Sequence, residues 1–266
     1  MSRRPTRGPT SADRDAGASG GTDHRADGTP QQIGITCPPD HAVFSTVATR
    51  LVERGYVVTF FDAERAVHDD HLGPLSLFVH KRTRPASVES LLRAERSGVP
   101  TWNSATGVSA CVSRFSQLCL LESVGFSVPT ASRSKPSGEY VAKNLYHWDM
   151  SPELNGEGDL YEEYLPAEPV DYKYYAVDDG EEVHARVLRA TSKLFGEKRV
   201  LGGADPVPTH VDRIRDLMHR VGLRAVGVDL VRVDDDWYAV DLNPCPSFRG
   251  TGLEAALVDS IVACVR

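Results

Sequence analysis

Short apolar runs alternate with amphipathic, helix-like stretches in the first part of the chain after Gln32. Residues 42–54 and 87–96 have the helical pattern, and Gly55 stands where a left-handed cap would end the first helix. The apolar runs predict four strands, over residues 33–36, 56–61, 75–80 and 99–102. This alternation is typical of βαβ units and predicts a small parallel sheet with helices on its faces.

Strand patterns dominate the rest of the chain, after a helix predicted over residues 108–124 that ends at Gly125. The pattern predicts strands over residues 140–143, 160–165, 172–178, 182–189, 225–233 and 237–242, and helices over residues 212–221 and 253–264. Many strands with few helices between them indicate a largely antiparallel α+β unit. The expected fold class is therefore α/β plus α+β, with one domain over residues 31–102 and a second over residues 103–266.

Residues 1–30 lack this patterning. They contain no aromatic residue, and Met1 and four alanines are their only members of the hydrophobic set. Such a segment cannot bury enough apolar surface to offset the entropy lost on ordering. We therefore expect a disordered N-terminal tail.

Composition and charge narrow the function classes. Lys and Arg number 30 against 37 Asp and Glu, a net charge of −7, so a nucleic-acid partner is not expected. Five cysteines without CxxC spacing indicate neither a disulfide framework nor a zinc finger, and they favour a reducing, cytoplasmic setting. No apolar run approaches the roughly 20 residues of a membrane span, so a membrane partner is not expected either.

The most informative segment is a predicted hairpin whose turn is Asp234–Asp236. With a three-residue loop, Asp229 lies opposite Asp241, and Asn243 shares their face of the sheet. Two facing carboxylates repel each other unless positive charge lies close to them, and oxygen ligands of this kind suit Mg²⁺ or Mn²⁺. Two interpretations stay open at this point. The alternative is a solvated polar face, and a two-residue loop would put the two carboxylates out of register.

The hairpin continues into Asn243-Pro-Cys-Pro-Ser-Phe-Arg-Gly, and here the sequence resembles the ATP-grasp superfamily, particularly the branch of the ribosomal-protein S6 glutamate ligase. In that branch the last two strands carry a Gly-Val-Asp, then an acidic residue and an Asn two apart, which bind magnesium. Asp229, Asp241 and Asn243 match this pattern. The resemblance covers roughly residues 100–265 and implies an ATP-grasp fold, ATP and Mg²⁺ (or Mn²⁺) as cofactors, and a small N-terminal α/β domain before it.

The resemblance also implies roles for residues upstream of the hairpin. Tyr140-Val-Ala-Lys143 is similar to the strand whose lysine contacts the ATP phosphates, and the arginine at the end of a later strand would be on the phosphate side. The implied nucleotide-binding positions are Lys143, the linker residues Glu163, Tyr164 and Leu165 against the adenine, Asp171, and the loop residues Lys198 and Arg199; the phosphate-side arginine is Arg189. The sequence departs from the family pattern in one respect, because no glycine-rich phosphate loop follows Lys143.

The implied chemistry is a ligase reaction in which a carboxylate forms an acyl phosphate with ATP and is then joined to an amine or similar nucleophile. Arg249, after the hairpin, is a candidate to bind a carboxylate or phosphate of the acceptor, and a surface salt bridge is the alternative. Two other functions stay open. One is an ATP-grasp kinase similar to the inositol-phosphate kinases, and the other is a nucleotide-binding module without catalysis. The sequence does not name the carboxylate or the amine.

Overall fold

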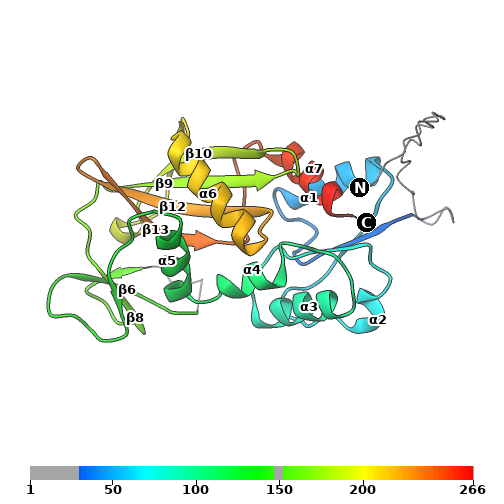
Figure 1. Cartoon of the computed structure of the whole chain (residues 1–266), viewed down its shortest axis with the longest axis horizontal. Helices are drawn as coiled ribbons and strands as arrows, with labels where there is room; N and C mark the ends of the chain where they lie inside the picture. Colours follow the sequence, from blue (N-terminus) through cyan, green and yellow to red (C-terminus); the bar gives the residue numbers. More distant parts are fainter. Residues whose placement is uncertain (1–29, 147–151, 266) are drawn as a thin grey trace, which may run out of the picture.

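The computed structural model describes residues 30–146 and 152–265, which form three sheets flanked by helices (Figure 1). Residues 1–29 of the predicted tail lie outside the described part. The combination of one parallel and two antiparallel sheets confirms the predicted α/β plus α+β class.

The first sheet is parallel, with the strand order β2-β1-β3-β4. Its helix α1 places Phe44, Val47, Ala48 and Leu51 on one buried face, which is the spacing that predicted it. Gly55 follows that helix with φ 91°, as expected for its cap. The elements are β1 Gln32–Ile35, α1 Phe44–Glu53, β2 Val57–Phe60, α2 Asp69–Leu72, β3 Leu77–Val79, α3 Pro85–Arg96 and β4 Thr101–Trp102.

The single helix predicted over residues 108–124 is wrong. The structure has two shorter helices there, α4 Ala105–Ala110 and α5 Arg114–Ser123. Gln117 of α5 donates its side-chain Nε2 to the Cys111 carbonyl at 2.7 Å, so a side chain satisfies a carbonyl at the break. The break lets α5 begin beside β13, and this puts Arg114 next to the hairpin.

The second sheet is antiparallel, with the order β11-β10-β9-β12-β13, and a third, smaller antiparallel sheet has the order β5-β8-β6-β7. Most of these strands were predicted. The short β5 and β7, and β11 with its exposed Val200 and Leu201, were not. The bounds are β5 Ala131–Ser132, β6 Tyr140–Lys143, β7 Glu153–Leu154, β8 Leu160–Glu163, β9 Val170–Asp178, β10 Val183–Thr191, η1 Lys193–Phe195, β11 Val200–Ala204, α6 Pro208–Val221, β12 Ala225–Val233, β13 Asp236–Asn243 and α7 Glu254–Cys264.

The two faces of the β9–β13 sheet are covered differently. Helix α6 crosses one face (Figure 1), where Leu217 and Met218 belong to the same core as Tyr174 and Val228. Helix α7 belongs to the other core, together with β1, β3 and the second half of β9. The first half of β9 therefore extends beyond the cover of α7, and this part of the sheet faces the small β5–β8 sheet instead.

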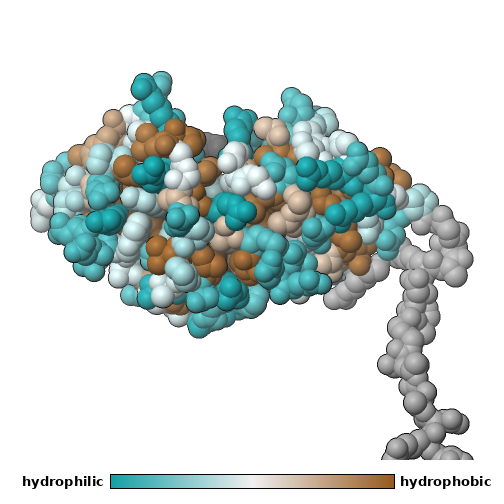
Figure 2. All heavy atoms as spheres, turned by 90° about the horizontal axis from the view of Figure 1, so that it is seen from above, coloured by the Kyte–Doolittle hydropathy of each residue, from teal (hydrophilic) through white to brown (hydrophobic). Residues whose placement is uncertain are grey.

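Hydrophobic residues on the face seen in Figure 2 lie in small groups separated by hydrophilic ones. Within residues 30–146 and 152–265, no helix combines the length and the apolar character that crossing a membrane would require.

Candidate active site

The β12–β13 hairpin brings Asp229 and Asp241 directly opposite each other, as predicted, but by a different route. Its turn has two residues, because Val233 pairs with Asp236, and Asp234 adopts φ 53°. A two-residue turn alone would put the two carboxylates out of register. A β-bulge at Val240 adds the missing residue and restores their pairing.

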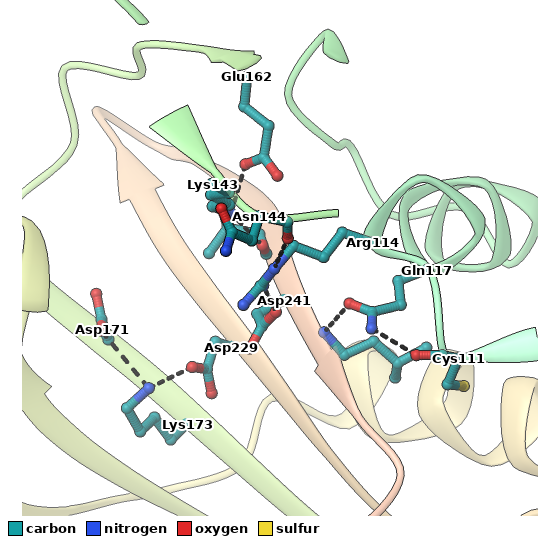
Figure 3. Close-up of polar contacts among 12 residues, drawn as sticks. Cys111, Arg114, Gln117, Lys143, Asn144, Glu162, Asp171, Lys173, Asp229 and Asp241 are labelled. Atoms are coloured by element: carbon teal, nitrogen blue, oxygen red, sulfur yellow. Dashed lines mark hydrogen bonds and ion pairs between the residues drawn. The ribbon is translucent and has the colours of Figure 1, made fainter. Parts of the chain in front are cut away.

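Each of the two facing carboxylates has its own cation (Figure 3). Asp229 forms an ion pair with Lys173, which also lies 3.5 Å from a carboxylate oxygen of Asp171. Asp241 forms an ion pair with Arg114, whose Nε donates to the Asn144 carbonyl at 3.0 Å. The register of β9 and β12 pairs Lys173 with Asp229, so both side chains project from the same face of the sheet. The two cations balance the repulsion that the hairpin alone would create.

The pKa directions agree with this arrangement. Burial lowers the pKa of Lys173, but Asp229 and Asp171 outweigh it and raise this pKa above its ordinary value. Burial raises the pKa of Asp171, with Lys173 opposing and Asp229 adding to the shift. Lys173 therefore stays charged at neutral pH between two carboxylates.

A second buried ion pair comes from the small sheet. Lys143 on β6 lies 2.6 Å from a carboxylate oxygen of Glu162 on β8, and the two side chains are 10% and 4% exposed. The same ammonium donates to the carbonyl of the bulged Val240 at 2.9 Å, so it bridges the two sheets. Burial raises the pKa of Glu162, while Lys143 and then Arg114 oppose the shift. Gly158 permits this packing, because a Cβ there would lie 2.6 Å from the Lys143 carbonyl oxygen.

These groups surround a cavity of about 170 Å³ between the two antiparallel sheets. Its lining contains both apolar and charged side chains. The apolar part of the lining comprises Pro129, Val141, Pro152, Leu165, Ala167, Leu194, Phe195, Val231 and Val240. The charged part comprises Arg114, Lys143, Glu162, Glu163, Glu168, Asp171, Lys173, Lys193, Asp229 and Asp241. A lining of this kind suits a ligand that has an apolar group and an anionic group accompanied by a cation.

The donor set fits a hard divalent cation. Two facing carboxylates supply only oxygen ligands and leave coordination positions for water and phosphate. Asn243 shares their face, one pair further along opposite Gly227, and its Oδ1 accepts from the Cys245 amide at 2.8 Å. No cluster of three His, Cys, Asp or Glu side chains occurs at metal-binding geometry in the part of the chain that is described. A metal would therefore rely on the two aspartates and on oxygen atoms from a ligand.

No protein-family model and no curated protein matches this sequence. Solved structures do match it. The ATP-grasp ligase PsnB, complexed with a phosphomimetic variant of its minimal precursor, Mg and ADP, superposes with a TM-score of 0.66 at 19% identity, covering 90% of this chain and 99% of PsnB. The macrocyclase MdnC of Microcystis aeruginosa MRC, bound with precursor peptide MdnA, gives 0.63 at 13% identity, with coverages of 87% and 99%. A RimK domain ATP-grasp protein from Sphaerobacter thermophilus DSM 20745 gives 0.64 at 14% identity, with coverages of 87% and 99%. The chain has the ATP-grasp fold.

Within this ATP-grasp fold, several residues named from the sequence line one cavity. The predicted site residues that line it are Lys143, Glu163, Leu165, Asp171, Asp229 and Asp241. Tyr164 and Asn243 are not among its lining residues. Lys198 and Arg199 are exposed on the loop before β11, where η1 residues line the cavity instead. The backbone loop is exposed, but partial desolvation of the Lys198 ammonium, and then the positive charge of Lys173, lowers the pKa of Lys198, so its side chain lies near the site.

Two predicted catalytic arginines do not join the cavity. Arg189 pairs with Tyr172 across β10 and β9, so its side chain is on the face opposite to Lys173. The arginine of β10 that shares the face of Lys173 is Arg186, which pairs with Tyr175. Arg249 is exposed on the loop after β13, and it lies close enough to His41 to lower the pKa of that imidazole.

Five charged residues that line the cavity were not among the predicted positions: Arg114, Glu162, Glu168, Lys173 and Lys193. Three of them, Arg114, Glu162 and Lys173, form the ion pairs of the site. Lys173 could have been found, because residues two apart on a strand share a face, and Asp171 was already assigned to the site. Glu162 is buried because β8 lies between β5 and β6, an arrangement of strands that the sequence pattern did not indicate. Arg114 depends on the helix break and had no signal in the sequence.

Proposed function

We propose that this protein is an ATP- and Mg²⁺-dependent ligase that activates a carboxylate as an acyl phosphate and joins it to an amine or similar nucleophile. The observation that carries this proposal is the cavity between the two antiparallel sheets, whose lining combines apolar side chains with the facing pair Asp229 and Asp241 and their cations. The apolar part suits an adenine ring and the charged part suits a triphosphate with its metal.

The charged residues of the cavity have separate roles in this reaction. Asp229 and Asp241 would hold Mg²⁺, which supplies neutralisation of charge on the phosphate oxygens. Lys143, Lys173 and Arg114 line the charged part and would orient the phosphates. An oxygen of the substrate carboxylate attacks the γ-phosphorus and ADP leaves. The amine then attacks the acyl carbon, its proton is lost, and inorganic phosphate leaves.

The similar structures support the same chemistry. PsnB and MdnC are described with precursor peptides, and PsnB also with Mg and ADP. Their identity to this chain is below 20%, so peptide substrates are their property, and the substrates of this chain stay open. The cytoplasmic setting expected from the cysteines belongs to the same proposal.

Thermal unfolding of the full chain tests the nucleotide and metal site. Mg·ADP at about a hundred times its Kd is expected to stabilise the wild type by roughly 2.7 kcal/mol, a rise in Tm of about 5–10 °C, and the rise should require the metal. Asp241→Ala should abolish most of it. Asp235→Ala, on the exposed turn of the same hairpin, is the matched control and should retain it.

No rise in wild-type Tm at millimolar Mg·ADP would refute the proposal. A rise that Asp241→Ala keeps would place the metal elsewhere. The kinase alternative predicts the same rise in Tm and is separated by the products, because a ligase releases inorganic phosphate whereas a kinase leaves the phosphoryl group on its acceptor.

A further inference from the structure

A second cavity, of about 400 Å³, adjoins the active site on the side of the N-terminal sheet. Three segments far apart in the sequence line it: the one after β1, the one after β3 and the one after β13. Its lining residues are Cys37, Pro38, His41, Lys81, Arg82, Thr83, Arg84, Asn243, Cys245 and Ser247. Asn243 of this lining and Asp241 of the active-site lining project from the same face of β13, two residues apart, so the two cavities meet β13 at neighbouring positions.

Lys81 is the unusual residue of this second cavity. It is only 5% exposed, its ammonium donates to the Cys245 carbonyl at 3.0 Å, and it lies 5.4 Å from the centre of the Phe44 ring. Within residues 30–146 and 152–265, no carboxylate lies at ion-pair distance from its Nζ. A carbonyl and a ring face compensate a buried ammonium only in part, so this cation is costly to keep in the free protein.

The contrast with the other buried lysines is direct. Lys143 has Glu162, and Lys173 has both Asp229 and Asp171. Burial lowers the pKa of Lys81, and no carboxylate offsets this effect; the opposing contributions come from the Cys245 and Cys37 thiols. The free protein thus leaves an open place for a negative charge at Lys81.

The surrounding charges keep this cavity positive. Arg82 and Arg84 also line it, and both lie near Glu64, at 3.8 Å and 3.0 Å. His41 has its pKa lowered to about 4, first by burial and then by Lys81 and Arg249, with Asp40 opposing. Asp40 is exposed, so solvent weakens its field at the buried ammonium. The net field inside the cavity favours an anion.

We propose that the second cavity binds an anionic group, carboxylate or phosphate, of the substrate that meets the nucleotide, with the Lys81 ammonium as its principal ligand. This inference rests on the proposed function, since the bound group would be anchored beside Asn243 while another group of the same substrate reaches the Asp229–Asp241 pair. It specifies the substrate class: a molecule that carries an anionic group in addition to the one that reacts.

The test measures Tm of the full chain with a saturating non-hydrolysable Mg·ATP analogue, so that the α-, β- and γ-phosphate positions of the active site are all filled. Inorganic phosphate and succinate are the two anion probes, and chloride at the same ionic strength is the reference. Tenfold above Kd, a bound anion is expected to raise wild-type Tm by about 3 °C. A larger rise with phosphate assigns the site to a phosphate group, and a larger rise with succinate assigns it to a carboxylate.

Three variants locate the effect. Lys81→Met should abolish the anion-dependent rise while keeping the rise produced by Mg·ADP, and Lys81→Arg should keep both. Lys135→Met removes an exposed lysine on the small sheet and should change neither. An equal anion-dependent rise in wild type and Lys81→Met, or no rise with either anion in the wild type, would overturn the proposal.

If Lys81→Met does not fold, the anion-dependent rise in wild-type Tm and its retention in Lys81→Arg still test the anion site. Failure of the proposed function has a separate signature, which is the absence of any rise in wild-type Tm with Mg·ADP. In that case the anion probes are applied without nucleotide, and the Lys81 variants still report on the second cavity.

Discussion

The two neighbouring cavities lie next to each other along β13 but treat buried charge in opposite ways. In the active-site cavity, every buried or half-buried lysine faces a carboxylate, and Asp241 faces Arg114. In the second cavity, the ammonium of Lys81 has a carbonyl and an aromatic ring as its partners. The buried lysines of the first cavity are paired with carboxylates before any ligand arrives, whereas Lys81 of the second gains a negative partner only when an anion binds.

This difference decides how strongly each cavity attracts a charged ligand. In the active site, an incoming metal competes with Lys173 and Arg114 for the same carboxylates, so part of its attraction is spent on displacing existing ion pairs. In the second cavity, an incoming anion meets a cation whose desolvation cost is already present in the folded protein. Preorganisation of this kind favours binding at the unbalanced cavity.

The largest effect on the free energy of unfolding is expected at Lys143. Lys143→Met leaves Glu162 buried without its partner and should lower the free energy of unfolding by about 3 kcal/mol. The double variant Lys143→Met/Glu162→Leu should recover most of that loss, because no unpaired charge remains. Urea unfolding measures both. Lys81→Met is the contrasting variant and should cause no such loss, since it removes a cation without a carboxylate partner.

If Lys143→Met and Lys81→Met lowered the free energy of unfolding equally, the contrast between a paired and an unpaired buried lysine would be wrong. A double variant as unstable as Lys143→Met would mean that lost packing, and not the unpaired carboxylate, causes the effect.

A smaller effect is expected at Lys173. Lys173→Met leaves Asp229 and Asp171 without their shared cation and should lower the free energy of unfolding by about 2 kcal/mol, since Asp229 is partly solvated. Millimolar Mg²⁺ should restore part of this loss, and should stabilise the variant more than the wild type. Calorimetry with and without Mg²⁺ measures this. Lys135→Met, in an exposed ion pair, should cost less than about 0.5 kcal/mol, and a Lys173→Met protein indifferent to Mg²⁺ would argue against a metal at Asp229.

The smallest effect concerns the Cys37 thiol in the second cavity. Burial raises its pKa to about 11 from an ordinary value of 9.0, with Lys81 opposing the shift. Between pH 9 and 11 the folded state therefore holds more protons than the unfolded state, so stability falls as pH rises. The contribution is on the order of 1–2 kcal/mol.

Cys37→Ala should flatten the decline in unfolding free energy over this pH window, measured by urea unfolding at each pH. Cys119→Ala, which removes an exposed thiol, is the control and should leave the slope unchanged. In a Lys81→Met background the decline should steepen, because the cation that favours the thiolate is gone. Identical slopes for Cys37→Ala and Cys119→Ala would contradict the burial of Cys37.

Local patterning in the sequence was sufficient for most of the elements. Helix α1 follows from periodicity, because it buries one face and the spacing of its apolar residues records that face. Strand β12 follows from its apolar run, because most of its residues are buried on both faces of the sheet. The position of Arg189, in contrast, depends on the length of one turn. The predicted strands 172–178 and 182–189 leave three residues between them, which would pair Arg189 with Asp171 on the face of Lys173. The structure has four, residues 179–182, and pairs Arg189 with Tyr172, away from Lys173.

Other features had no local signal. The turn of the hairpin is shorter than expected, and only the bulge at Val240 returns Asp241 to the face of Asp229. The carbonyl of that bulged residue accepts a hydrogen bond from Lys143, which is 97 residues away in the chain. The prediction thus paired the right carboxylates with the wrong loop, because the turn is one residue shorter than predicted and the bulge at Val240 adds one residue.

The sequence by itself determined the fold class and the hairpin that carries Asp229 and Asp241, since periodicity and hairpin formation act between residues that are close along the chain. Only the tertiary structure decided which charges meet. Arg114 and Asp241 are 127 residues apart, and Lys81 and Cys245 are 164 residues apart. Whether a buried cation gains a carboxylate or remains without one depends on how distant elements pack, and that packing sets the local dielectric and the partners available.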